Sequence, residues 1–264
     1  MNFSTAVLRL SLVSFIAALS AVVAGCKTSQ TEQTAIAPRL MQPVEFADFT
    51  VADISSREGA AHLMNQKIKI GSDAADAYDF LSKGETNRIH VETINQYEAA
   101  KAEGYFARNT FEITMESWFI NTDLTLGFMA GAQPSQHSYF SKNIGLDLPP
   151  TVLGGFGERD DGLKADEENG VTLKDYTKSY GRRHIYNIRK SEVGVSFSCN
   201  DGCNYSVQEL ARGDVDRDGS EDALIVIATY AQGGSGRDYN PCIVTKTGPK
   251  QRVKFVEMGK HTEK

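Results

Sequence analysis

Four aspartates near the carboxyl-terminal end of the chain have the spacing best suited to chemistry. Three of them alternate, a glycine follows, and the fourth stands eight residues after the first. Carboxylates at alternate positions of a curled loop converge on one point, and calcium is a hard cation that takes about six to eight oxygen ligands. Glycine permits the sharp turn that such a loop needs. The segment therefore predicts a calcium site whose ligands are the side chains of Asp214, Asp216, Asp218 and Asp222 and the carbonyl oxygen of Ser220.

The loop runs into an aliphatic segment, Ala-Leu-Ile-Val-Ile, which favours a strand rather than a helix. Ile225 stands where a helical EF-hand has its bidentate glutamate. A D-x-D-x-D-G-x-x-D loop followed by a strand resembles the calcium loops of FG-GAP and VCBS-type repeats. The resemblance covers about fifteen residues and implies a structural Ca²⁺ ion. Because the motif occurs once, it does not imply a propeller.

An acidic turn without a metal is the alternative interpretation of this segment. Four crowded carboxylates repel one another at neutral pH unless a cation lies among them, which favours the calcium site. A catalytic role for the ion is disfavoured, because loops of this type fill the coordination shell of calcium with protein oxygens.

Two cysteines flank a turn sequence further along the chain. Cys199 and Cys203 enclose Asn-Asp-Gly, which suits a three-residue hairpin loop. The cysteines would then lie opposite each other, close enough for a disulfide. We therefore predict a Cys199–Cys203 disulfide, with Cys242 as the other possible partner. Zinc is the competing interpretation, but three thiols with no nearby histidine are an incomplete ligand set.

Ser135, His137 and Asp147 are the residues from which a hydrolytic triad could be assembled. No G-x-S-x-G segment surrounds a serine, and no H-E-x-x-H segment is present. A hydrolase with a site built from the loops of residues 133–170 is therefore the alternative function, and an enzyme is not the favoured one.

The elements that must position these residues differ between the two halves of the chain. Caps and apolar periodicity predict helices at residues 55–65, 72–82 and 92–103. Residues 111–120 alternate between apolar and polar types, which predicts a half-buried strand, and a helix is expected at 122–132. Prolines, glycines and acidic residues make 146–173 an expected loop.

From about residue 184 the pattern becomes β. Strands are expected at residues 184–188, 193–199, 204–210, 223–230, 239–245 and 252–257. Short strands separated by turn signals are typical of an antiparallel meander. The predicted fold class is thus α+β, with a helix-rich amino-terminal half packed on a carboxy-terminal β-meander that carries the calcium loop.

The amino terminus carries an export signal. Residues 10–25 are uncharged and mostly apolar, and only Arg9 precedes them as a cation. They end in Val23-Ala24-Gly25-Cys26, which resembles the lipobox of bacterial lipoproteins. The resemblance implies cleavage after Gly25, lipid on the Cys26 sulfur and an acyl chain such as palmitate on the new amino terminus, which together give stable anchoring. The alternatives are an uncleaved signal anchor and ordinary signal cleavage with an incidental cysteine.

These observations divide the chain into a signal peptide (1–25), a lipidated cysteine with a flexible polar tether (26–42) and a single globular α+β domain (43–264). Lys27 stands where an aspartate would favour retention in the inner membrane, so by family analogy the outer membrane, facing the periplasm, is expected. The net charge of −6 and the lack of a basic tract argue against nucleic-acid binding. We expect a lipid-anchored cell-envelope protein, a non-catalytic binding or structural module with an envelope protein as a possible partner.

Overall fold

The computed structural model of the chain describes residues 34–54, 56–71, 77–84, 86–142, 144–153, 161–178, 183–234 and 236–256. The predicted signal peptide, Cys26 and residues 27–33 of the predicted tether lie outside these ranges. The described residues from 35 to 256 form one compact unit. Within the described ranges, no helix combines the length and the apolar character needed to cross a membrane.

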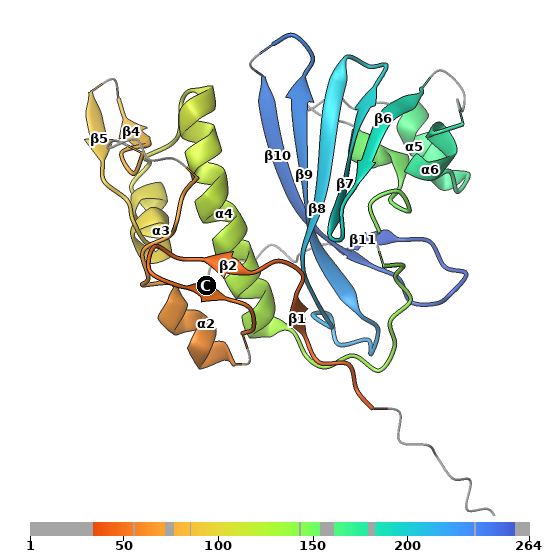
Figure 1. Cartoon of the computed structure of the whole chain (residues 1–264), viewed down its shortest axis with the longest axis horizontal. Helices are drawn as coiled ribbons and strands as arrows, with labels where there is room; N and C mark the ends of the chain where they lie inside the picture. The colour runs from red at the N-terminus through yellow and green to blue at the C-terminus, as the bar shows by residue number, and fades with distance from the viewer. Residues whose placement is uncertain are drawn as a thin grey trace, which may run out of the picture. The chain divides into compact units, whose positions relative to one another are not determined.

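An antiparallel sheet forms the carboxy-terminal half of this unit (Figure 1). Its main strands are β6 (Ile185–Lys190), β7 (Gly194–Cys199), β8 (Cys203–Gly213), β9 (Asp222–Ala231), β10 (Arg237–Thr245) and β11 (Lys254–Val256). They are hydrogen-bonded in chain order, each to the strand before and after it. The predicted meander and the α+β class are confirmed.

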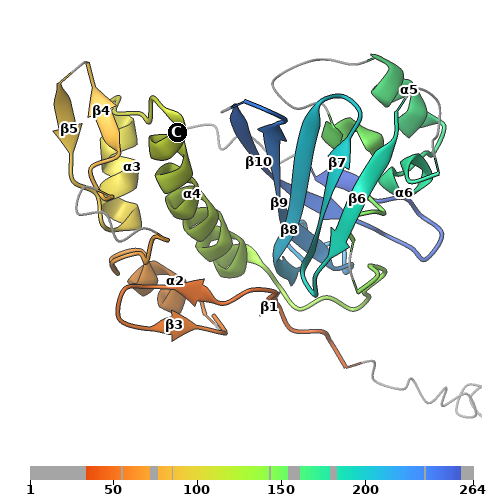
Figure 2. The same ribbon diagram turned by 45° about the horizontal axis from the view of Figure 1, so that its top comes forward.

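The burial of the central strand β9 shows that both faces of the sheet are covered. The strand is buried over most of its length, as expected of a strand with protein on both faces. Leu224 and Val226 belong to one hydrophobic core, whereas Ala223, Ile225 and Ile227 belong to a second. Because successive side chains point to opposite faces, the sheet lies between two cores. The two views agree that α4 lies on one side of the sheet, with α5 and α6 on the other (Figures 1 and 2).

The layer on the first core contains the helices α2 (Arg57–Leu63), α3 (Ile94–Ala102) and α4 (Thr110–Gly131). The two-stranded sheets β2 (Val44–Glu45) with β3 (Thr50–Val51), and β4 (Leu81–Lys83) with β5 (Asn87–Ile89), precede α3. Ser56 and Thr93 cap α2 and α3, and α2 packs against α4. The helices expected at 55–65 and 92–103 are confirmed.

The strand predicted at residues 111–120 is wrong, because these residues form the first half of α4. Asn109 caps the helix, and its side-chain oxygen accepts a hydrogen bond from the Glu112 backbone N–H. Buried positions then recur at the helical spacing of three and four residues, at Met115, Phe119 and Leu126 among others. Glu112 itself is buried, where its carboxylate pairs with Arg88 at 2.9 Å. The apparent alternation of apolar and polar residues therefore does not reflect two faces of a strand.

The second core is covered by residues from 144–153 and 161–176, and the loop predicted at 146–173 is therefore wrong where these residues are helical. They include the 3₁₀ helix η1 (Pro150–Leu153), α5 (Asp161–Glu168) and α6 (Leu173–Tyr176). The helix expected at 72–82 is also wrong at its end, where β4 is found, and residues 72–76 lie outside the described residues.

The folded part begins earlier than residue 43. Strand β1 (Arg39–Leu40) pairs antiparallel with β8, in the register Arg39 with Arg212 and Leu40 with Ala211. Ile36 forms a bridge with Ser135, in the segment that follows α4. Residues 36–40 therefore belong to the sheet side of the structure and not to a flexible tether.

Candidate metal centre

The predicted calcium loop is the connection between β8 and β9. Gly213 and Asp222 are its last paired residues, so the loop spans residues 214–221. Gly213 also permits close packing, because a Cβ atom there would lie 2.7 Å from the Ala132 Cβ and 3.1 Å from the Pro38 Cβ. The loop is thereby held against both the end of α4 and the segment that leads into β1.

Two left-handed residues turn the loop between its aspartates. Arg217 has a φ of 65° and Gly219 a φ of 86°. Asp214 stabilises both turns, since its Oδ1 accepts from the Arg217 N–H at 2.7 Å and its Oδ2 from the Gly219 N–H at 2.9 Å. Asp216 and Asp218 each accept from the backbone N–H two residues later, as Asx turns do.

This backbone brings three of the predicted ligands together. One carboxylate oxygen each of Asp214, Asp216 and Asp218 lies within 4.8 Å of the others, so the three can hold a metal ion. Asp214 is buried, and the other two are exposed. Desolvation by burial, with the negative charges of Asp218 and Asp214, raises the pKa of Asp216. A cation would relieve this repulsion, and three carboxylates are hard oxygen donors suited to calcium or magnesium.

Asp222 is placed differently from the other three aspartates. It is fully buried, and its Oδ2 accepts from the Val215 N–H at 2.8 Å, so it closes the loop at its base. Burial raises the pKa of Asp222 to about 6. Its Oδ1 has no hydrogen-bond partner among the described residues and remains as a possible ligand atom. The structure does not place Asp222 within the three-carboxylate cluster.

The segment that follows α4 lies along the loop. Gln133 exchanges two backbone hydrogen bonds with Asp214, at 2.7 and 3.0 Å. The Gly219 carbonyl accepts from the backbone N–H groups of Gln136 and His137, and the His137 carbonyl accepts from Glu221. These hydrogen bonds fix the segment after α4 against the loop, at the point where the chain passes from the helical layer to the sheet. Ser220, whose carbonyl is the fifth predicted ligand, lies in this bonded stretch and is a buried residue.

A buried network of charges beside the loop was not predicted from the sequence. Arg212 lies between Glu209 and Glu221, with N–O distances of 3.1 and 3.4 Å. All three residues are at most 4% exposed. Glu221 also pairs with Arg39 and accepts from the Ser138 hydroxyl at 2.6 Å. The sequence signal for this network is the presence of two charged residues, Glu209 and Arg212, in the strand β8.

The cysteines lie on the predicted hairpin. The turn between β7 and β8 spans residues 200–202, and Phe197 pairs with Tyr205, so Cys199 and Cys203 face each other across the hairpin. Among the described cysteines the structure contains no disulfide, and all are in the thiol form. Burial raises the pKa of the Cys199 thiol, which disfavours the reactive thiolate.

Cys242 is too distant to be the other partner. It pairs with Ile225, and Ile225 pairs with Glu209, which is six residues from Cys203 along β8. Six residues of strand span about 20 Å, whereas disulfide-bonded Cα atoms lie within about 7 Å.

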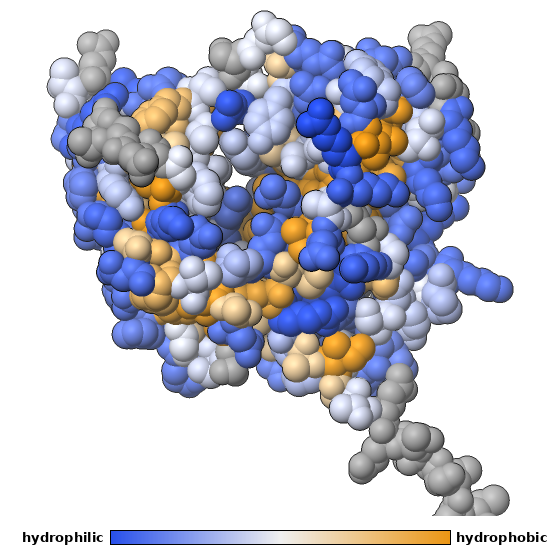
Figure 3. Space-filling model, in the orientation of Figure 1, coloured by the Kyte–Doolittle hydropathy of each residue, from blue (hydrophilic) through white to orange (hydrophobic). Residues whose placement is uncertain are grey.

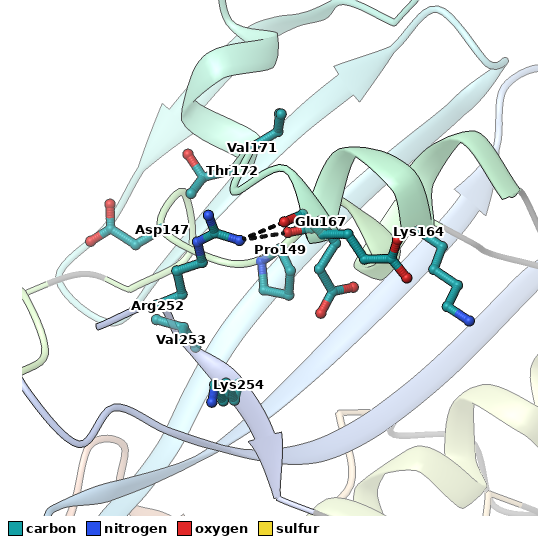
Figure 4. Close-up of a pocket in the computed structure, with 10 residues that line it drawn as sticks. Asp147, Pro149, Lys164, Glu167, Val171, Thr172, Arg252, Val253 and Lys254 are labelled. Carbon is teal, nitrogen blue, oxygen red and sulfur yellow. Dashed lines mark hydrogen bonds between the residues drawn. The ribbon is translucent and has the colours of Figure 1, made fainter. Parts of the chain in front are cut away.

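The residues of the possible hydrolytic triad are not assembled. The Ser135 hydroxyl is buried without a hydrogen-bond partner among the described residues, and His137 stacks on Tyr139. Asp147 lines a different place, a cleft of about 370 Å³ beside α5 and β11 (Figure 4). The residues that line this cleft include no serine, cysteine or histidine.

Arg252 makes polar contacts across this cleft. Its guanidinium donates to the Glu167 and Glu168 carbonyls at 3.0 and 3.1 Å, at the end of α5 (Figure 4). A cation at the carboxyl end of a helix is a stabilising contact. The arrangement attaches α5 to the end of the sheet.

Comparison of the chain with protein-family models, with curated proteins and with solved structures finds no match.

Proposed function

We propose that the chain is a lipid-anchored cell-envelope protein whose folded part is a non-catalytic binding or structural module stabilised by a calcium ion. The observation that carries this proposal is the cluster of Asp214, Asp216 and Asp218 in a loop that also bonds to the segment after α4. The sequence similarity of this loop to FG-GAP and VCBS calcium loops supports the same ion.

Calcium suits the site better than magnesium does. Magnesium requires a near-ideal octahedron and retains its water, whereas calcium accepts irregular shells of carboxylate and carbonyl oxygens. The Ser220 carbonyl and the unbonded Asp222 Oδ1 are the further oxygens that the chain offers at the base of the loop. The ion would neutralise crowded carboxylates and hold together the turns around Arg217 and Gly219.

The site favours a structural role for the ion. The loop connects β8, β9 and the segment after α4, so an ion there would strengthen the junction between the sheet and the helical layer. The proposed anchor rests on the Val23–Cys26 segment, and the proposed outer-membrane location rests on Lys27. An envelope protein remains the proposed partner, in addition to the membrane that holds the lipid.

Thermal unfolding of residues 27–264 in calcium, magnesium and chelator tests the role of the ion. Unfolding disperses the aspartates, so calcium binds the native state preferentially, and a concentration one hundred times its dissociation constant should add about 2.7 kcal/mol of stability. Magnesium should have a weaker effect. Asp216→Ala should reduce or abolish the calcium-dependent gain.

Asp48→Ala is the matched control, because Asp48 is an exposed aspartate outside the loop. It should retain the full response to calcium. Identical unfolding midpoints in calcium and chelator, together with no binding heat in calorimetry, would show that the aspartates form only an acidic turn.

A further inference from the structure

A large groove lies beside the metal loop. It is a groove of about 1050 Å³ between α2, the end of α4 and the segment before β1, with Arg217 of the loop at its edge. In the space-filling view of Figure 3, apolar residues are exposed around α2 and the lower end of α4, next to hydrophilic ones. A groove of this size accommodates a small molecule.

The chemistry of the groove combines apolar walls with positive charge. Ile54, Met64 and Met129 contribute apolar surface. Arg57 and Arg217 contribute two guanidinium groups, neither of which has an ion pair with any described residue. Asp53 is the single carboxylate in the lining. The groove is therefore locally positive in a chain whose net charge is −6.

Helix α4 forms the floor of the groove, and two of its lining residues are glycines, which have no side chain. Gly127 and Gly131 of α4 line it, and a Cβ atom at either position would meet no atom within 4 Å. Glycine is the least favourable helix residue after proline. Neither glycine is required by packing against this chain, and both leave space that a ligand can fill.

We propose that this groove binds an amphipathic anion of small-molecule size, an apolar body that carries one acidic group. The apolar body lies along the glycine face of α4 between Met64 and Met129, and the acidic group pairs with Arg57 and Arg217. This inference rests on the proposed role as a binding module and names the class of its ligand. Because Arg217 belongs to the loop, the ligand contacts the element that the metal ion organises.

Calorimetric titration of residues 27–264 with dodecanoate tests the proposal. The dodecanoate concentration is kept below the one at which micelles form. The thermal transition of the same protein shows that it is folded. One molecule should bind per chain. Dodecanol, which lacks the charge, and inorganic phosphate, which lacks the apolar body, should each bind more weakly. Arg57→Gln and Arg217→Asn should each weaken dodecanoate binding about tenfold; asparagine at 217 tolerates the left-handed backbone.

Two further variants separate binding from folding. Gly127→Leu places a side chain in the groove and should abolish binding while the thermal transition is retained, because no protein atom obstructs it. Arg189→Gln, at an exposed arginine of β6, should bind as the wild type does.

Undiminished binding by folded Gly127→Leu, or equal binding of dodecanol and dodecanoate, would overturn the proposal. Binding of many molecules per chain would show detergent-like adsorption only and would also overturn it. A calcium response without dodecanoate binding would refute the groove alone, whereas binding without a calcium response would refute the metal site alone.

Discussion

Replacing Arg212 by methionine removes the cation that lies between two buried carboxylates. Glu221 retains Arg39 and Ser138 as partners, but Glu209 loses its ion pair while it remains only 2% exposed. Breaking a buried ion pair by removing one partner costs about 3–5 kcal/mol, because an uncompensated charge stays in the protein. For a domain of this size, that loss lowers the unfolding midpoint by roughly 6–20 °C.

Urea denaturation of Arg212→Met, monitored by circular dichroism, measures this loss directly. Arg212→Met combined with Glu209→Leu should recover most of the stability, since an apolar pair of similar volume replaces the ion pair.

Arg189→Met is the control, and it should change stability by less than about 0.5 kcal/mol because Arg189 is exposed. A loss below about 1 kcal/mol in Arg212→Met, or a double variant no more stable than the single one, would refute the reasoning. Either result would mean that the network is solvated in solution.

Three further predictions concern the anchor, the thiols and pH. Cys26→Ser should abolish labelling by a fatty-acid analogue in cells, and equal labelling of the variant would end the lipoprotein interpretation. Cys199 and Cys203 face each other as thiols, so oxidation should join them. Protein purified from an oxidising compartment and denatured without reductant should then show one reactive thiol, Cys242, among the three cysteines after Cys26, and three reactive thiols would contradict this pairing. Burial, with the charge of Glu98, raises the pKa of Asp123 to about 6 from 3.8, so stability falls as pH rises through this range. Asp123→Asn should therefore add about 1–3 kcal/mol at pH 8 and little at pH 4, and an equal gain at both pH values in urea denaturation would rule out this cause.

The β half of the fold was predictable because its signals are local. Each strand of the meander is bounded by turn residues and pairs with its neighbour in the chain. The helices were less predictable where tertiary contacts decide the structure. The alternation of residue types at the start of α4 predicts a strand with Glu112 on its exposed face, whereas Glu112 is buried and pairs with Arg88. Helix α5 is short and buries a single side chain, Leu163, so its sequence shows no extended apolar stripe.

The candidate site shows the same division. The cluster of Asp214, Asp216 and Asp218 follows from spacing alone, since the loop is local. The different position of Asp222 could not be predicted, because its carboxylate bonds to the backbone of Val215 inside the fold. The charge network beside the loop depends on residues that only the sheet brings together.

The pairing of β1 with β8 has a consequence for the order in which the protein folds. Arg39 and its partner Glu221 are 182 residues apart in the chain. At a synthesis rate of about 5–20 residues per second, roughly 10–35 s pass between the appearance of the first residue and that of the second. The meander itself needs only neighbouring strands and can form as it emerges, whereas β1 must wait in an extended, unpaired state. The contacts of β1 with β8 and of Arg39 with Glu221 can therefore form only after most of the chain has been made, and they lie beside the metal loop.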